Sequence, residues 1–141
     1  MLYVVATPIG NLDDISERTI KTLKEVDFIL SEDTRTTRKL LSHFKINTEL
    51  ESFHQHSSQD RIDYLLQLLR EGNDLALVTE SGTPTVSDPG GRLVDQAHKA
   101  DLEVSPIPGP SALATAASVC GFPMNDFLFL GFPPKKKRDN F

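Results

Sequence analysis

Residues 78–92 read Val-Thr-Glu-Ser-Gly-Thr-Pro-Thr-Val-Ser-Asp-Pro-Gly-Gly-Arg, and the architecture of the whole chain can be worked out from this segment. The apolar run Leu75–Val78, which leads into it, is typical of a buried strand. Ser81–Pro84 predicts a tight turn in which Gly82 lets a ligand approach the main chain. Asp88-Pro89 predicts a helix N-cap followed by a proline at the first helical position. A strand, a glycine turn and a capped helix together indicate a ligand pocket at the carboxyl end of a parallel sheet.

The same segment has a simpler interpretation, which is an ordinary connection between a strand and a helix. Connections of that kind usually contain about 2–6 residues. The segment between Val78 and the expected helix start at Pro89 is longer than that. Its length therefore favours a loop that contributes to ligand binding.

The composition is that of one ordinary domain with a hydrophobic core. The chain has 141 residues, of which 38% are hydrophobic and 25% charged, within the usual range for globular proteins. A net charge of −5 does not suggest a nucleic-acid binder from charge alone. Cys120 is the single cysteine, which excludes an internal disulfide framework or a cysteine-rich zinc site and fits a cytoplasmic location. Neither a secretion signal nor a membrane span is expected.

Five strand-like segments alternate with helical ones along the chain. The strands are expected at Leu2–Ala6, Phe28–Leu30, Thr48–Phe53, Leu75–Val78 and Val104–Ile107. The third is weak and is expected near an edge, and the fifth contains Pro106, which suits a sheet margin. This alternation predicts an α/β fold with a five-stranded, mostly parallel sheet and helices on both faces.

Apolar residues at helical spacing mark the helices. A helix is expected over Ile15–Val26, with Asp14 and Glu17 forming a capping box at its start. The clearest helix has apolar residues at i, i+3, i+4 and i+7 and ends near Gly72, a C-terminal cap; its apolar residues are Ile62, Leu65, Leu66 and Leu69. Ala112–Val119 is small and apolar nearly all round, which predicts a buried helix.

The C-terminal part of the sequence suggests a chain that continues into another domain. Phe127–Leu130 predicts one more strand, and the basic run Lys135–Arg138 follows it. We expect an N-terminal α/β domain over residues 1–121, with residues 122–141 as a linker and first strand leading to a domain outside this chain. The basic run is most often a solvated linker, and contact with a phosphate backbone is the alternative.

Candidate site residues come from the loops that follow the strands, because the carboxyl ends of parallel strands meet at one edge. These loops are Thr7–Asn11, Ser31–Arg35, His54–Ser58, Thr79–Asp88 and Pro108–Ala112. Three of them are rich in glycine, proline and hydroxyl groups and suit a ligand held by the backbone. The other two carry charge or imidazole and suit proton transfer or phosphate binding. The absence of G-x-x-x-x-G-K and G-x-G-x-x-G disfavours a nucleoside triphosphate or a dinucleotide.

Two groups of polar residues have more than one interpretation. His54 and His56 could be metal ligands, but their i, i+2 spacing without a cysteine or a third ligand favours a solvated or RNA-facing pair. Glu32, Asp33 and Arg35 could be a functional group, or a capped helix start with a weak surface ion pair. The residues alone leave this second choice open.

The five loop motifs, in this order, resemble those of the tetrapyrrole methylase superfamily. The closest resemblance is to its ribosomal branch, which 2′-O-methylates a cytidine of small-subunit ribosomal RNA in bacteria. The motifs are Thr-Pro-Ile-Gly-Asn-Leu (7–12), Glu-Asp-Thr-Arg (32–35), Phe-His-Gln-His (53–56), Ser-Gly-Thr-Pro…Ser-Asp-Pro-Gly (81–90) and Pro-Gly-Pro-Ser-Ala (108–112). The similarity extends over essentially all 141 residues. Glu80-Ser81 stands where the family usually has Asp-Ala.

The resemblance implies a two-domain enzyme, usually a homodimer, with S-adenosyl-L-methionine bound between its two α/β domains and no metal. By motif match the cofactor-binding residues are Pro8, Ile9, Gly82, Thr83, Pro84, Val86, Ser111 and Ala112. The sulfonium methyl group is already activated, so the enzyme mainly aligns the acceptor and excludes water. A ribose hydroxyl also needs a base. Asp33 and His54 are the candidate bases, and Arg35 is a candidate anchor for phosphate or carboxylate.

Three functions stay open at this point: a ribosomal RNA ribose methyltransferase, a methylase of a tetrapyrrole or other small molecule, and a non-catalytic domain that binds S-adenosylmethionine or RNA. The motifs at 32–35 and 53–56 and the basic run at 135–138 favour ribosomal RNA and the small ribosomal subunit as partner. The acidic net charge opposes this choice mildly.

Overall fold

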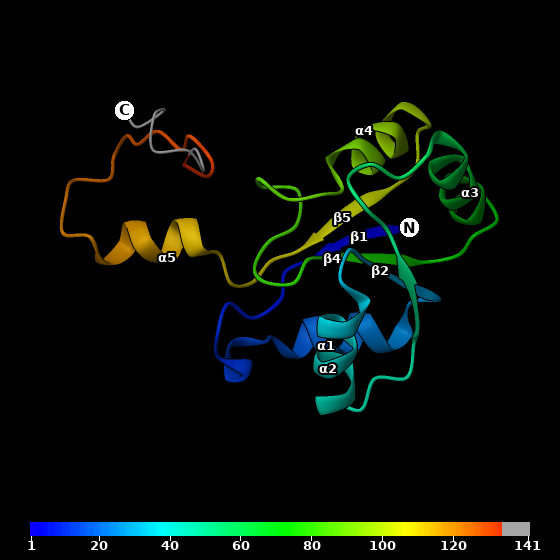
Figure 1. Ribbon diagram of the computed structural model, residues 1–141, viewed down its shortest axis with the longest axis horizontal. Coiled ribbons are helices and arrows are strands. Elements are labelled where there is room, and N and C mark those ends of the chain that lie inside the picture. The colour runs from blue at the N-terminus through cyan, green and yellow to red at the C-terminus, as the bar shows by residue number, and fades with distance from the viewer. Residues whose placement is uncertain (134–141) are drawn as a thin grey trace. The chain divides into compact units, whose positions relative to one another are not determined.

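A computed structural model describes residues 1–133, and the chain divides into two units, Met1–Ser111 and Ala112–Phe141 (Figure 1). In the first unit five strands form one sheet in the order β3-β2-β4-β1-β5. The strands are β1 (Leu2–Val5), β2 (Phe28–Ser31), β3 (Glu49–Ser52), β4 (Leu75–Val78) and β5 (Val104–Ile107). Every pair of neighbouring strands is parallel, which confirms the predicted sheet.

The two edge strands are those whose sequences predict an edge. β3 is partly exposed along its length, whereas all four residues of β4 are buried. In β5, Pro106 stands opposite Val4 of β1. A proline has no N–H to offer a further strand, so it is tolerated where the sheet ends.

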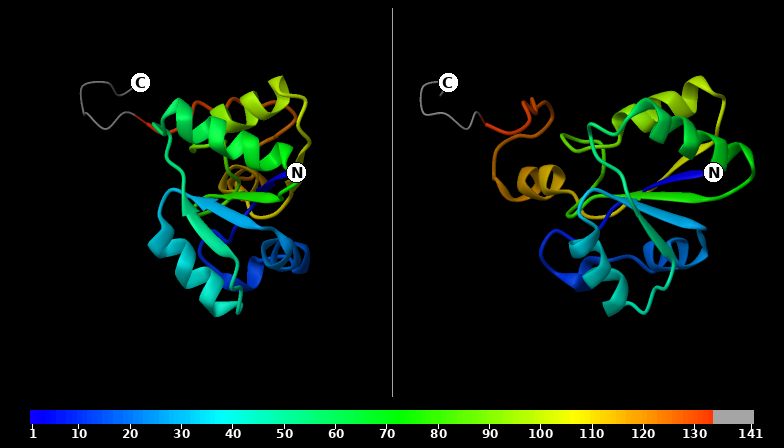
Figure 2. Two further views of the ribbon diagram at one scale, coloured as in Figure 1. Left: turned by 90° about the vertical axis from the view of Figure 1, so that its right-hand side faces the viewer. Right: turned by 45° about the vertical axis from the view of Figure 1, so that its right-hand side comes forward.

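Four helices cover the sheet. They are α1 (Glu17–Glu25), α2 (Thr34–His43), α3 (Gln59–Arg70) and α4 (Gly91–Lys99). Figures 1 and 2 show α1 and α2 on one face and α3 and α4 on the other. Successive strand residues point to opposite faces, so Leu75 and Leu77 of β4 pack under α3 and α4, while Ala76 and Val78 pack under α1 and α2.

The start of α1 differs from the prediction. Asp14 belongs to a short 3-10 helix, Leu12–Asp14, and the N-cap of α1 is Ser16. The Ser16 hydroxyl accepts a hydrogen bond from the Thr19 amide at 3.0 Å. The capping-box prediction was wrong because serine is as good an N-cap as aspartate, and Ser16 lies where the chain enters the helix.

The start of α4 also differs. The helix begins at Gly91, and its N-cap is Gly90, which has a φ of 114°. Asp88-Pro89 therefore lies in the loop and does not cap the helix, contrary to the prediction. The loop is longer than predicted because Thr85 and Ser87 also have positive φ angles, 71° and 58°. These conformations turn the chain again before the helix starts.

The second unit contains α5 (Ala112–Val119), followed by irregular chain as far as residue 133. The predicted bounds of this helix are correct, but the predicted burial is wrong, because none of its residues is buried. Phe127–Leu130 forms no strand, contrary to the prediction. A strand needs a neighbour and an apolar helix needs a second layer, and the described part of this unit supplies neither. The basic run 135–138 lies outside the described residues.

Candidate functional site

The loops after β1 and β4 are joined to each other at the carboxyl edge of the sheet. Thr7 and Gly82 form an antiparallel bridge with two backbone hydrogen bonds, from Thr7 N to Gly82 O at 2.9 Å and from Gly82 N to Thr7 O at 3.0 Å. The Thr7 hydroxyl also donates to the carbonyl of Thr79 at 3.1 Å. These bonds hold the first and fourth loops in a fixed relation.

The loop after β5 meets the same place. The Thr83 hydroxyl donates to the carbonyl of Pro110 at 3.2 Å. Gly82 has a φ of 85°, and a Cβ there would lie 3.3 Å from Cγ2 of Ile9 and 3.7 Å from the Pro110 carbonyl oxygen. A glycine is therefore required at position 82, because three loops of the protein pack against one another there. This requirement adds to the predicted approach of a ligand to the main chain.

The structure brings together several of the residues predicted to bind the cofactor. Ile9, Gly82 and Thr83 meet at the loop junction. Their neighbours along the chain, Pro8 and Pro84, are buried. Val86 is 46% exposed on the long loop. Ser111 ends the first unit next to Pro110, and Ala112 is the first residue of α5 in the second unit.

The chemistry of this junction fits S-adenosylmethionine. Backbone carbonyl and amide groups, the hydroxyl of Thr83 and the exposed apolar side chain of Val86 lie on one connected set of loops. Such a set can hydrogen-bond an amino-acid end and offer apolar contact to a base. The left-handed conformations of Thr85 and Ser87 cost about 1–3 kcal/mol each, and strain of this kind gathers at ligand sites.

Asp33 has a structural role at the start of α2. Its Oδ1 accepts hydrogen bonds from the amides of Arg35 at 2.9 Å and Thr36 at 3.3 Å, so Asp33 is the N-cap of that helix. These backbone hydrogen bonds lower the pKa of Asp33, which makes its carboxylate a weaker base. The Arg35 Nε lies 3.4 Å from the same oxygen, and the rest of the arginine side chain is exposed.

His54 lies close to the carboxylate of Glu32. Its Nδ1 lies 4.0 Å from Oε1 of Glu32. Asp88 belongs to the same neighbourhood: burial raises its pKa, a hydrogen bond from Thr79 opposes the rise, and the charge of Glu32 adds to it. The sequence placed Glu32 in a candidate group with Asp33 and Arg35 without a role of its own, and Asp88 was predicted to be a helix cap. The adjacent pair Glu32-Asp33 could have indicated a role for Glu32, because the cap of the helix uses only one of the two carboxylates.

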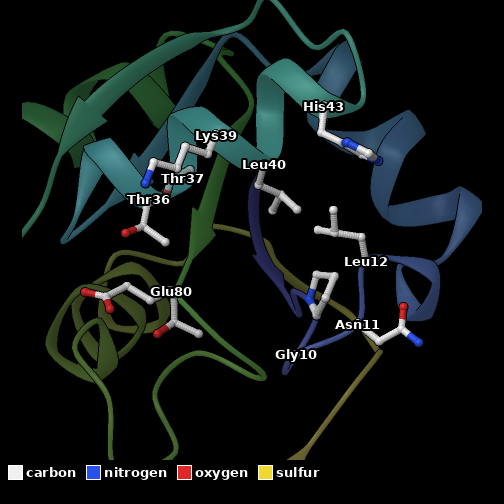
Figure 3. Close-up of a pocket in the computed structure, with 11 residues that line it drawn as sticks. Gly10, Asn11, Leu12, Thr36, Thr37, Lys39, Leu40, His43 and Glu80 are labelled. Carbon is white, nitrogen blue, oxygen red and sulfur yellow. The ribbon is translucent and has the colours of Figure 1, made fainter.

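A cavity of about 340 Å³ opens between α2 and the loops after β1 and β4 (Figure 3). Its lining residues are Pro8, Gly10, Asn11, Leu12, Thr36, Thr37, Lys39, Leu40, His43, Thr79 and Glu80. Leu12 and Leu40 point toward each other across it in Figure 3. Of this lining, the sequence indicated only the loop residues, because the polar face of α2 has the pattern of any solvated helix.

Residues 1–133 contain no group of three or more histidine, cysteine, aspartate or glutamate side chains placed to hold a metal ion. Within the same residues, no helix has the length and apolar character that crossing a bilayer requires.

Comparison with known proteins gives relatives that match nearly the whole chain. Proteins named "Ribosomal RNA small subunit methyltransferase I" are 49% identical over 136 residues in Thermotoga maritima, 50% over 137 in Halalkalibacterium halodurans and 47% over 137 in Escherichia coli O157:H7. The matches cover 96%, 97% and 97% of this chain and 61%, 47% and 48% of those proteins. The chain thus spans about half the length of the curated relatives it matches.

A solved structure shares the fold. The crystal structure of uroporphyrin-III-C-methyltransferase from Thermus thermophilus superposes with a TM-score of 0.62 at 20% identity, over 89% of this chain and 53% of that one. The model of the family described as Tetrapyrrole (Corrin/Porphyrin) Methylases matches residues 1–138. Since the family model matches residues 1–138 of the 141-residue chain and the parallel sheet is present, the chain belongs to the tetrapyrrole methylase family.

Proposed function

We propose that the protein is an S-adenosylmethionine-dependent methyltransferase that 2′-O-methylates a cytidine of small-subunit ribosomal RNA. The observation that carries the proposal is the identity of 47–50% over nearly the whole chain to proteins named as small-subunit ribosomal RNA methyltransferases. The choice of a ribose oxygen on cytidine rests on the resemblance of the five loop motifs to the ribosomal branch.

S-adenosylmethionine is the proposed methyl donor, and when bound it supplies an activated methyl group. The residues proposed to hold it are Pro8, Ile9, Gly82, Thr83, Pro84, Val86, Ser111 and Ala112. The hydrogen-bonded junction of Thr7, Gly82, Thr83 and Pro110 supports this assignment, because fixed loops orient a ligand without an ordering cost at the moment of binding.

The proton of the ribose hydroxyl must go to a base, and we assign that role to His54. Its imidazole lies at the same strand edge as the loops, and the Glu32 carboxylate 4.0 Å away can orient it. Arg35 presents an exposed guanidinium that suits a phosphate or carboxylate. Asp33 is then a positioning residue, since its carboxylate is engaged by the first amides of α2.

The proposed partners are ribosomal RNA in the small subunit and a second copy of the protein, in the cytoplasm. The first is supported by the names of the relatives, and the homodimer by the resemblance to the family. Light scattering on the eluting peak of a size-exclusion column tests the dimer, and a mass of one chain would contradict it.

The function is tested with the protein at its natural full length. It is incubated with tritiated S-adenosylmethionine and small ribosomal subunits from a strain that lacks the enzyme, and any label is mapped in the RNA. The expected result is label at a single ribose 2′-oxygen, strongly reduced in His54→Ala. Absence of label on RNA, with S-adenosylmethionine binding intact by calorimetry, would overturn the proposal in favour of a small-molecule methylase or a non-catalytic binding domain.

A further inference from the structure

We propose that the cavity between α2 and the loops after β1 and β4 holds one unstacked nucleotide of single-stranded RNA, with flanking phosphates on the exposed cations of α2. The inference rests on the proposed function and extends it by naming the surface that receives the substrate. Of the residues that carry it, only Pro8 belongs also to the proposed cofactor site, and Arg35 is the proposed anchor named above.

The cavity has the shape and chemistry of a slot for a base. Leu12 and Leu40 face each other (Figure 3), and Pro8 also lines the cavity, so the middle of the slot is apolar. Polar groups stand at its ends, with Thr36 and Glu80 facing each other at one end and Asn11 and His43 at the other. A mostly apolar cavity with a few polar groups is typical of sites for small ligands.

The face of α2 beside the slot is positively charged, although the whole chain is acidic. α2 contains Arg35, Arg38 and Lys39 and no acidic residue. In residues 1–133, no carboxylate lies within 4.0 Å of the Arg38 or Lys39 side chain, and Arg35 has only its neighbour Asp33. Arg35, Arg38 and Lys39 surround a second depression, and Lys39 also lines the slot. Cations gathered on one helix face are the usual electrostatic footprint of a phosphate backbone.

Size and chemistry favour a single extruded nucleotide over a duplex. A cavity of about 340 Å³ lies at the small end of the range of ligand pockets. Proteins recognise RNA sequence mainly in unpaired segments, where an unstacked base can enter a pocket of the protein. The carboxylate of Glu80 repels phosphate but accepts a hydrogen bond from an exocyclic amino group. The slot therefore favours a base with an exocyclic amino group, such as cytosine, over uracil.

The test measures binding of fluorescent single-stranded RNA octamers to the full-length protein by anisotropy, as a function of salt. Each phosphate contact contributes about −0.7 to the slope of log K against log salt for single strands. We expect the double variant Arg38→Gln, Lys39→Gln to bind more weakly and to have a slope less steep by about 1.4. The matched control is Lys21→Gln, Lys24→Gln on α1, which removes the same charge from another exposed helix face and is expected to bind like wild type.

The role of the slot is tested by changing the base at the centre of the octamer. Leu12 is 41% exposed, so Leu12→Ala can be made without disturbing the core. It is expected to weaken binding about threefold to tenfold for an octamer with a central cytidine, as the loss of apolar contact requires, and to leave binding of the octamer with an abasic central position unchanged. Glu80→Gln is expected to reduce the preference for cytidine over uridine at that position.

Equal salt slopes in the α1 and α2 double variants, or equal effects of Leu12→Ala on the normal and abasic octamers, would overturn the inference. The outcome is separable from that of the proposed function. If wild type methylates ribosomal RNA and the α2 variant does so equally well, the proposed RNA-binding slot is contradicted while the proposed function stands. If wild type binds the octamers as described but transfers no methyl group to RNA, the proposed function fails and the binding site stands. If the octamers do not bind at all, the site fails.

Discussion

Asp33 can act as a base or as a helix cap, and the two roles predict different effects of substitutions at this position. Its carboxylate accepts two amide hydrogen bonds that lower its pKa. Asparagine keeps an oxygen for those amides and removes the charge, whereas alanine removes both. A role as the cap therefore depends on the oxygen, and a role as the base depends on the charge.

We expect Asp33→Ala to lower both the melting temperature and methyl transfer, and Asp33→Asn to retain most of both. Thermal unfolding and the tritium assay measure the two quantities in the same preparations. If Asp33→Asn were as inactive as Asp33→Ala while it melted like wild type, Asp33 would be the base and the assignment of His54 would be wrong.

Asp88 links pH to stability with a definite sign. Burial and the charge of Glu32 raise its pKa, against a hydrogen bond from Thr79, so the folded state holds the proton to higher pH than the unfolded state. Its contribution to the free energy of unfolding is complete below the unfolded pKa of about 3.9, and it is lost as the pH rises through the folded pKa.

Asp88→Asn removes this titration. We expect the variant to gain stability relative to wild type as the pH rises from about 3 to 7, measured as the difference between urea unfolding free energies at each pH. Parallel curves for the two proteins across that interval would show that Asp88 has the same pKa in the folded and unfolded states.

At the scale of elements, the start of α4 depends on a glycine packed against the sheet. Gly90 has a φ of 114°, and a Cβ there would collide with the side chain of Leu77 on β4. We expect Gly90→Ala to reduce the free energy of unfolding by at least about 2 kcal/mol, from backbone strain and overpacking together. Urea denaturation at neutral pH measures the loss.

The neighbouring glycine supplies the control. Gly91 is the first residue of α4, and a Cβ there meets nothing within 4 Å. Gly91→Ala is expected to be neutral or to stabilise by up to about 1 kcal/mol. If both variants lost the same stability, the cause would be a general sensitivity of the loop, and contact with Leu77 would not explain it.

The elements could be predicted from the sequence wherever one local pattern dominated. The unbroken apolar run Leu75–Val78 fixed the central strand, and Pro106 marked an edge. Helix starts were less predictable, because Asp14 and Ser16 are both good caps and only the path of the chain selects between them. In the loop before α4, the positive φ angles of Thr85 and Ser87 move the start of the helix to a later residue. Threonine and serine have no local preference that predicts such angles.

The candidate site was predictable in part for a similar reason. The parallel topology places all strand ends at one edge, so the convergence of the loops on that edge could be predicted from the alternation of strands and helices. The pairing of His54 with Glu32, the position of Asp88 and the slot beside Lys39 depend on side-chain directions across segments far apart in the sequence. Those directions are set by tertiary packing, which a linear pattern does not contain.

At the scale of the whole molecule, the buried hydrophobic residues all lie between Leu2 and Ile107 in the described chain. They form two clusters, one on each face of the sheet, while α5 has no buried residue. A chain of residues 1–111 is therefore expected to fold with a free energy of unfolding within about 0.5 kcal/mol of the 141-residue chain. Urea titration followed by circular dichroism checks this, and a loss above about 2 kcal/mol would show that residues after 111 support the core.

The strand order also determines when this domain can fold during its synthesis. Among the strands of this sheet β1 comes first along the chain, yet its two neighbours in the sheet are β4 and β5. Leu2 pairs with Leu75 and Val104, so the strand has no partner until some seventy further residues have been translated. At about 5–20 residues per second, the apolar run Leu2–Val5 waits for several seconds unpaired. The nascent chain thus depends on α1 and the loops around it, or on a chaperone, to keep that first strand from pairing wrongly.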